Sequence, residues 1–411
     1  MELKTNYQYT YFIHPFVIKE GKYKEYIAKL LRDKRFKLKI FRKEKDLKMY
    51  RYFLPKTREL LFSSFSFTND EIRELEEKNI KEQAEILSKN ISNIFEYELE
   101  KNIQGKVGNS KGIFFTITKV EVICFKTGES FLSIRTSIEG DNNFVNTLNF
   151  NYKFRNINQE VSKLNGYDSI RLQPGNFEDV ETVKEFIKEI TEKDIGKEEI
   201  DINTERFLTF AYVCVDQEAW NSQTDFEKIK NQFVRYANIL PADNCRDFKE
   251  EKINTVEMWK YAKIGMTKQG LGLFSSTTDI NNYTLLPEEY QNQYFYTYIL
   301  NLYKKIYMKR LQNVFKDKKQ IKKGIKQFVE FTETMWNQEI TEDHIGTEIN
   351  KKISQTLELE TLYKSIKNKY DVIYKNNSME KNKKTNNVIT IILVISMIVN
   401  IINLIILNLN K

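Results

Sequence analysis

Few side chains in this chain of 411 residues are of the types that carry out covalent or metal chemistry. The only histidines are His14, which precedes Pro15 in a strand-like run, and His344, which lies in an acidic turn. Zinc sites and most catalytic triads depend on imidazole groups, and two isolated histidines supply neither arrangement. We therefore interpret both histidines as structural residues.

The three cysteines, Cys124, Cys214 and Cys245, are far apart and form no CxxC pair. Neither a disulfide framework nor a zinc knuckle is indicated, and a reducing compartment fits best. The sequence also lacks a nucleophile–base pair, a metal-ligand cluster and a glycine-rich phosphate fingerprint. We expect no catalytic residues, no metal ligands and no enzyme activity.

Positive charge is concentrated near the N-terminus. Residues 19–58 contain 16 lysines and arginines against five acidic residues, whereas the whole chain has a net charge of +8. Such a field favours phosphate-bearing ligands, nucleic acid or anionic lipid, although a solvated helix face is the simpler interpretation. Basic and aromatic residues alternate in "KRFKLKIFRKEK", yet we regard nucleic acid as an unlikely partner.

The C-terminal end is strongly apolar. Residues 388–409 contain no charge, proline or glycine, and as a helix they would extend about 33 Å. Since the hydrocarbon core of a bilayer is about 30 Å thick, the pattern predicts a transmembrane helix over 387–411. Four lysines within 375–384 place the body in the cytoplasm, and no signal peptide precedes it. The predicted localisation is the cell membrane, with a single-pass C-terminal anchor in the lipid bilayer.

Three polar residues interrupt this run: Ser396, Asn400 and Asn403 fall within a wedge of about 60° on a helix. In hydrocarbon, such groups seek hydrogen-bond partners on neighbouring helices or line a wet cavity. One interpretation is a self-associating bundle in which these three residues line a pore. The other is that the amides are merely tolerated, because an amide costs far less than a charge.

The rest of the pattern predicts an α/β cytoplasmic domain, with a mixed sheet covered by helices, over 1–215. Strands are expected at 7–18, 112–125 and 130–138, and one long helix over 69–102. Strand signals fade over 216–346, which we expect to be mostly helical with an irregular glycine-containing segment. A helix begins at Pro287. A stalk helix over 347–386, without proline or glycine, leads into the transmembrane helix.

This order of parts resembles the CorA superfamily of divalent-cation transporters and its CorA-like relatives. The resemblance is carried by "YQNQYFYTYILNLYKK", "FVEFTETMWNQEITEDHIGTEI" and "LELETLYKSIKNKYDVI" within 286–409. The family's Gly-Met-Asn motif is missing, and so is its second span. The resemblance implies a pentameric homo-oligomer whose first span lines a pore, while the missing motif argues against selective magnesium transport.

Some CorA-like proteins are thought to be membrane effectors of type III CRISPR antiviral defence, switched on by a nucleotide second messenger. The resemblance therefore implies a channel or effector gated by a nucleotide, or by a divalent ion such as Mg²⁺, bound to the cytoplasmic domain. The basic stretch is compatible with a phosphate-bearing ligand, and our candidate ligand-binding residues are Lys37, Lys39, Arg42 and Lys43. Two alternatives stay open: a tail-anchored binding module without transport activity, and a degenerate divalent-cation transporter.

Overall fold

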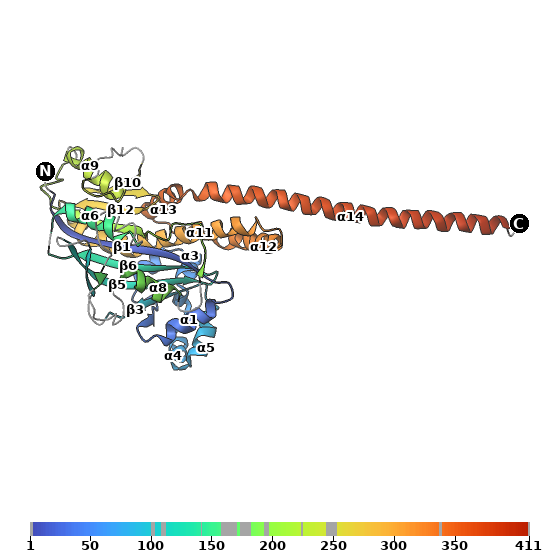
Figure 1. Cartoon of the computed structure of the whole chain (residues 1–411), viewed down its shortest axis with the longest axis horizontal. Helices are drawn as coiled ribbons and strands as arrows, with labels where there is room; N and C mark the ends of the chain where they lie inside the picture. Colours follow the sequence, from blue (N-terminus) through green and yellow to red (C-terminus); the bar gives the residue numbers. More distant parts are fainter. Residues whose placement is uncertain are drawn as a thin grey trace.

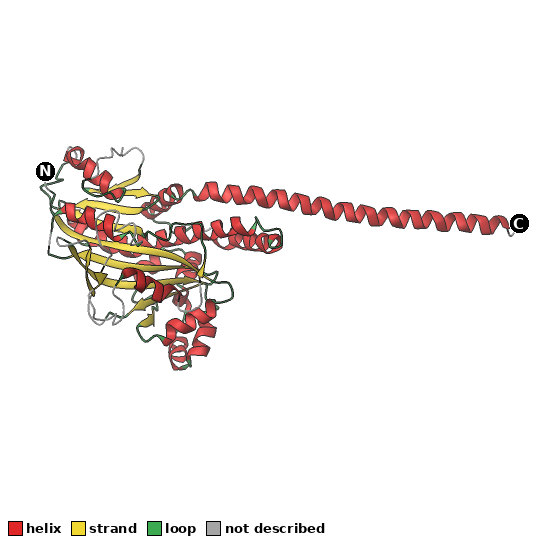
Figure 2. Cartoon of the chain, viewed as in Figure 1, coloured by secondary structure: helices red, strands yellow, loops and turns green. Residues whose placement is uncertain are grey.

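The structure is a computed structural model. It consists of a body, which contains all the strands among the described residues, and of one long helix that projects from this body (Figure 1). It describes residues 3–99, 103–107, 112–140, 142–157, 171–172, 182–192, 197–222, 225–243, 253–336 and 339–409, without the side chains of 171, 197, 376–385 and 398–409. Strands and helices are mixed throughout the body (Figure 2).

The described strands form one mixed sheet. Its main order is β10-β11-β12-β9-β1-β6-β5-β3-β2, with β4 beside β5 and β7, and β8 beside β1. All pairs are antiparallel except β9 and β12. The strands are β1 (Thr5–Ile18), β2 (Phe36–Leu38), β3 (Ser92–Tyr97), β4 (Ile103–Val107), β5 (Ile113–Phe125), β6 (Glu129–Ile138), β7 (Arg171–Leu172), β8 (Lys197–Glu198), β9 (Leu208–Val215), β10 (Asn254–Trp259), β11 (Ala262–Thr267) and β12 (Gly270–Ser276).

Helices cover both faces of this sheet, and the central strand β1 supplies side chains to both cores. Alternate residues of a strand point to opposite faces, so Tyr9 and Tyr11 enter one core while Phe12 and Phe16 enter the other. The helices are α1 (Tyr23–Arg32), α2 (Leu47–Tyr52), α3 (Pro55–Leu61), α4 (Asn69–Glu77), α5 (Ile80–Leu87), α6 (Phe144–Phe154), α8 (Val183–Glu192), α9 (Phe226–Ala237), α10 (Leu285–Glu289), α11 (Phe295–Val314), α12 (Ile321–Phe331), α13 (His344–Thr356) and α14 (Leu359–Leu409).

The predicted long helix over 69–102 is wrong. The segment forms α4, α5 and then strand β3. Asn79 caps a new helix, because its side chain accepts from the Glu82 backbone amide while the Glu82 carboxylate accepts from the Asn79 amide. Beyond α5, residues 92–96 pair with β5, and this tertiary pairing overrides the helical spacing.

The glycine-containing segment after residue 216 is not irregular, because it forms β11 and β12 at one end of the sheet. Gly265 and Gly272 lie under α9. A Cβ atom on Gly265 would stand 2.5 Å from the Cβ atom of Ala237, and one on Gly272 would stand 2.8 Å from Cε1 of Tyr236. These glycines permit close packing of α9 on the sheet. In the sequence they only interrupt the alternation of side chains that indicates a strand.

Around Pro287 the helix expected from sequence is present, as α10, a π-helical turn over Tyr290–Tyr294 and then α11. The predicted stalk is interrupted. Glu358 has a left-handed φ of 58° between α13 and α14, so the two helices are separate. The α14 helix alone has 51 residues and extends about 75 Å.

The predicted C-terminal transmembrane helix is wrong, and with it the single-pass membrane localisation. In the part of the chain that the structure describes, no helix is both long enough and apolar enough to cross a membrane. The apolar run with described side chains, Val388–Met397, spans ten residues or about 15 Å, roughly half the hydrocarbon thickness.

Candidate functional site

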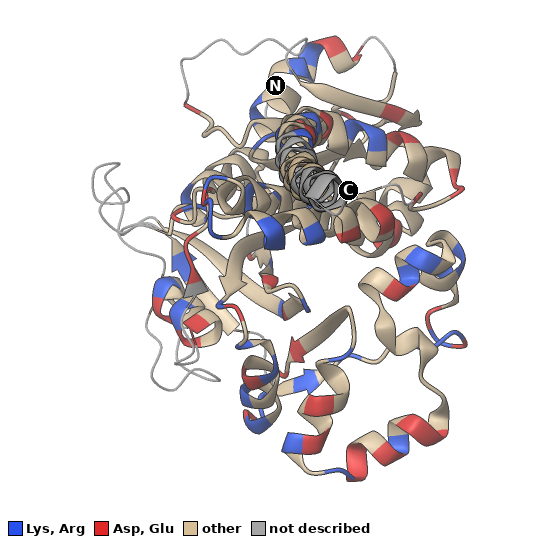
Figure 3. Ribbon diagram, turned by 90° about the vertical axis from the view of Figure 1, so that its right-hand side faces the viewer, with Lys and Arg blue, Asp and Glu red and all other residues tan. Residues whose placement is uncertain are grey.

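The four candidate basic residues do not converge on one surface. Lys37 on β2 forms an ion pair with Glu98, and Lys39 lies 2.7 Å from the Glu121 carboxylate. Figure 3 shows acidic residues beside basic ones over much of the body. The charge of Lys37 and Lys39 is therefore already balanced within the chain.

The other two candidates lie in the segment between β2 and α2. The Arg42 backbone amide donates to Asp46 over 2.9 Å, and the Lys43 ammonium group lies 5.0 Å from the centroid of the Tyr50 ring. Lys43 is exposed and has no ion pair among the described residues. Of the four candidates, it has the charge that is most open to a ligand.

The strongest ionic cluster surrounds Glu121 on β5, on the sheet face that α11 covers. One carboxylate oxygen of Glu121 accepts from Lys39 at 2.7 Å, from Lys119 at 3.0 Å and from the Tyr296 hydroxyl at 3.3 Å. The side chain of Glu121 is only 2% exposed. Burial alone would raise the pKa of this carboxyl, but Lys119 and Lys39 beside it bring the pKa to about 2.

A second ionic cluster joins α11 to the sheet near the other end of the helix. Arg310 donates to the fully buried Glu129 of β6 and lies 2.9 Å from Glu198 of β8. The Tyr303 hydroxyl lies 3.1 Å from the hydroxyl of Thr127 in the β5–β6 turn. Burial raises the pKa of Glu129, although Arg310 favours its ionised form. The two clusters fix α11 to the sheet along its length.

Helix α11 also contacts the elements that lead out of the body. Asn301 donates to Asn350 of α13 over 2.8 Å, and the side chains of α11 and α14 share one core. The Trp336 and Tyr363 rings stack with centroids 4.2 Å apart, and they hold the first turns of α14 against the segment after α12. If α11 moved on the sheet, the first turns of α14 would therefore move with it.

A cavity of about 380 Å³ lies beside the basic stretch, between α2, α3 and the start of β3. Arg58 lines it, with its guanidinium carbon 3.9 Å from the Tyr50 ring centroid and with NH1 donating to the Phe53 carbonyl over 2.7 Å. Lys89 and Phe65 line it as well. Neither Arg58 nor Lys89 forms an ion pair within the described ranges. Glu59 also lines the cavity, so two basic side chains and one acidic side chain leave a net positive charge that suits a small anion.

The distal part of α14 exposes apolar side chains on all sides. Over Val388–Met397, eight aliphatic or methionine side chains are 49% to 64% exposed. Ser396 is exposed among them, whereas the side chains of Asn400 and Asn403 lie outside those that the structure describes. The predicted polar wedge therefore stays a prediction, because two of its three side chains lie outside the described ones.

The sequence patterns missed Glu121, Glu129 and Arg310. Glu121 and Lys119 stand in "TKVEVICF", where charged residues alternate with apolar ones as on any solvent-facing strand. The structure buries that face under α11. A charged residue in a strand that is buried on both faces would indicate such a cluster. The sequence does not show that this strand is buried on both faces, so the indication appears only in the structure.

No protein-family model matches this chain, and no curated protein or solved structure is significantly similar to it. The resemblance to CorA-like proteins stays a prediction from the sequence.

Proposed function

We propose that this protein is a homo-oligomer whose copies associate through α14, with the body as the ligand-binding part of the assembly. The observation that supports this proposal is the apolar surface of Val388–Met397, which faces solvent in a single chain. A helix that is apolar on all sides is usually covered by other elements. The channel activity expected from the sequence presupposed a transmembrane helix and is not part of the proposal.

The energetics favour association. Fully burying one large aliphatic side chain contributes about 1.5 to 3 kcal/mol, and each copy presents eight partly exposed apolar side chains in this segment. The rotational and translational cost of association is about 4 to 15 kcal/mol. These side chains are about half exposed, so burying all eight in each of two copies would contribute about 12 to 24 kcal/mol, which is comparable to or larger than that cost. The first turns of α14 already pack against the body, so the rest of α14 projects from the body in a defined direction (Figure 1).

The experiment compares the native mass of the full chain with that of an Ile392→Glu/Ile395→Glu variant. We expect a defined oligomer for the full chain and a single chain for the variant, because buried carboxylates without partners oppose association. Asn368→Glu, at an exposed position near the base of α14, is the matched control and should remain oligomeric. A full chain that is monomeric at high concentration, or that binds phospholipid vesicles as a monomer, would contradict the proposal.

A second candidate function is anion binding in the Arg58 cavity. It is favoured by Arg58 and Lys89, which form no ion pair among the described residues, and by the exposed Lys43 nearby. The phosphate-bearing ligand expected from the sequence would contact basic side chains in this cavity, rather than Lys37 or Lys39. Titration with AMP and with inorganic phosphate tests this function. Arg58→Gln should weaken binding at least tenfold, whereas Lys56→Gln, on the same helix outside the cavity, should not.

A further inference from the structure

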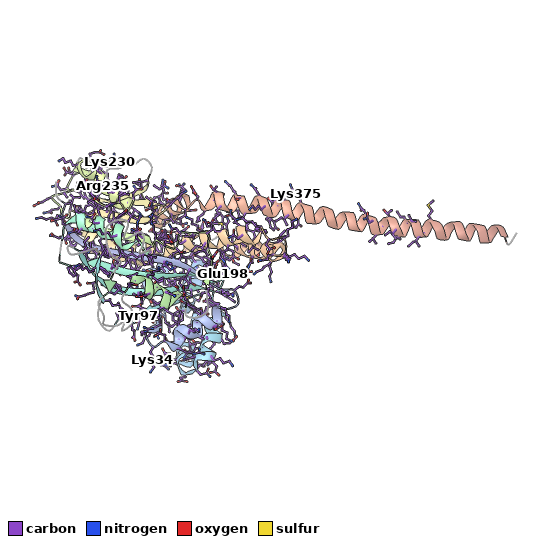
Figure 4. All side chains as sticks on the ribbon, in the orientation of Figure 1. Lys34, Tyr97, Glu198, Lys230, Arg235 and Lys375 are labelled. Atoms are coloured by element: carbon purple, nitrogen blue, oxygen red, sulfur yellow. The ribbon has the colours of Figure 1, made fainter. Side chains whose placement is uncertain are left out.

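A separate cavity of about 350 Å³ lies between the α11–α12 hairpin and the end of the sheet where β1 and β8 pair. Glu198, labelled in Figure 4, lies on the side of the body from which the hairpin and α14 project. The cavity is bounded by Glu20 after β1, by Glu198 and Glu199 at β8, and by the facing sides of α11 and α12. Its walls thus come from elements far apart in the sequence.

Negative charge exceeds positive charge around this cavity. Three carboxylates, Glu20, Glu198 and Glu199, line it together with two basic residues, Arg310 and Lys323. Lys323 forms an ion pair with Glu20, and Arg310 forms one with Glu198. Arg310 is also shared with the buried Glu129, behind the cavity. Glu199 is exposed and has no ion pair among the described residues. The cavity therefore favours a positively charged ligand.

The arrangement of the carboxylates argues for an extended organic cation. Within the described ranges, no group of three or more histidine, cysteine or acidic side chains could hold a metal ion. The carboxylates instead lie around a cavity whose wall includes the apolar side chains of Leu311 and Val314. Gln320 adds an amide carbonyl oxygen, which accepts hydrogen bonds from ammonium groups, whereas that of Asn313 already accepts from Lys316. Separated acidic groups with an apolar surface between them suit methylene chains that have an amino group at each end.

We propose that this cavity binds a short aliphatic diamine or polyamine. One ammonium group pairs with Glu199 and shares Glu198 with Arg310, and the methylene chain lies along Leu311 and Val314. The second ammonium group shares Glu20 with Lys323 and approaches the Gln320 amide oxygen. The ligand would connect the α11–α12 hairpin to β8 and to the residues after β1. This site goes beyond the self-association proposed above and does not depend on it, since binding and native mass are measured separately.

Calorimetric titration of the full chain with putrescine tests the proposal. We expect one putrescine per chain, with the monoamine butylamine at least tenfold weaker, because only a diamine reaches both groups of carboxylates. Glu199→Gln should raise the Kd at least tenfold. Glu199 is exposed and unpaired, so the folded structure should survive this substitution. Glu218→Gln, at an exposed acidic position outside the cavity, is the matched control and should leave the Kd unchanged.

Three results would overturn the proposal: no binding of putrescine, equal weakening by Glu199→Gln and Glu218→Gln, or displacement of putrescine by an equal concentration of Mg²⁺. The second result would indicate general attraction to an acidic surface, and the third a metal site. A monomeric chain that still binds putrescine with the expected stoichiometry would contradict the proposed oligomer but support this site.

Discussion

At the residue scale, the buried carboxylate of Glu121 is the nearest counter-charge of two partly buried lysines beside α11. Lys39 and Lys119 both lie within 3.0 Å of the same carboxylate oxygen. Charged groups taken out of water are costly unless they are paired and hydrogen-bonded. The cluster is therefore a point at which a single change in charge should have a large effect on the fold.

Glu121→Gln should lower the free energy of unfolding at pH 7 by about 3 to 5 kcal/mol, because it leaves two lysines in a nearly closed site without their counter-charge. Urea denaturation measures the change. Glu96→Gln is the control, since Glu96 is 44% exposed and lies 3.9 Å from Lys39. A loss no larger than that of the control would show that solvent already compensates the lysines.

The same carboxyl group predicts how stability depends on pH. Its pKa is about 2 in the folded state, against an ordinary value of 4.5. A depressed pKa means that the stabilisation is fully present above pH 4.5 and is lost as the pH falls from there towards 2. Glu121→Gln should therefore lose less stability than the natural chain between pH 4.5 and pH 3. If the free energy of unfolding falls equally with pH in the two proteins, the acid sensitivity comes from other groups.

At the scale of elements, the contact of α9 with β11 and β12 depends on two residues without side chains. Phe233 and Tyr236 of α9 lie directly over Gly265 and Gly272. Any added carbon on these glycines must displace the helix. This tight contact brings the β10–β12 segment into the same sheet as the N-terminal strands, through the parallel pairing of β12 with β9.

Gly265→Ala should destabilise the protein by about 1 to 3 kcal/mol through overpacking, as measured by thermal or urea unfolding. The added Cβ atom would meet that of Ala237 at 2.5 Å, so Ala237→Gly should recover part of the loss. The double-mutant cycle isolates this contact from the helix-propensity cost of glycine. Additive effects in the cycle would mean that α9 shifts freely on the sheet.

At the scale of the whole molecule, one sheet joins segments that the sequence assigned to different regions. Strand β9 pairs with β1 on one side and with β12 on the other. The tyrosines of β1 and the residues of α11 belong to the same core. Residues 1–215 therefore share their sheet and their main core with residues 254–357, whereas α14 beyond its base stands apart from both.

A chain ending at Val215 should not fold by itself, because it would expose the β9 edge and the sheet face that α11 covers. A chain ending at Asn386 should unfold in a single transition at nearly the temperature of the full chain. Circular dichroism melting measures both. A folded, cooperatively melting 1–215 fragment would show that the first region is an independent domain.

Local patterns alone determined much of the secondary structure. Alternation identified β1, β5 and β6, and the proline at 287 identified the helix around it, because these signals are properties of neighbouring residues. The apolar character of residues 388–409 is likewise plain in the sequence.

Only the tertiary structure decided which groups meet. Glu121 joins Lys39 and Tyr296 from distant segments, Glu129 meets Arg310, and Gly265 meets α9. These contacts join residues that are 28 to 181 positions apart in the chain, and no local pattern contains them. The strand over 92–96 has the same cause, since its pairing with β5 outweighs helix propensities of a few tenths of a kcal/mol per residue. The division between α4 and α5, in contrast, follows from the local capping box at Asn79.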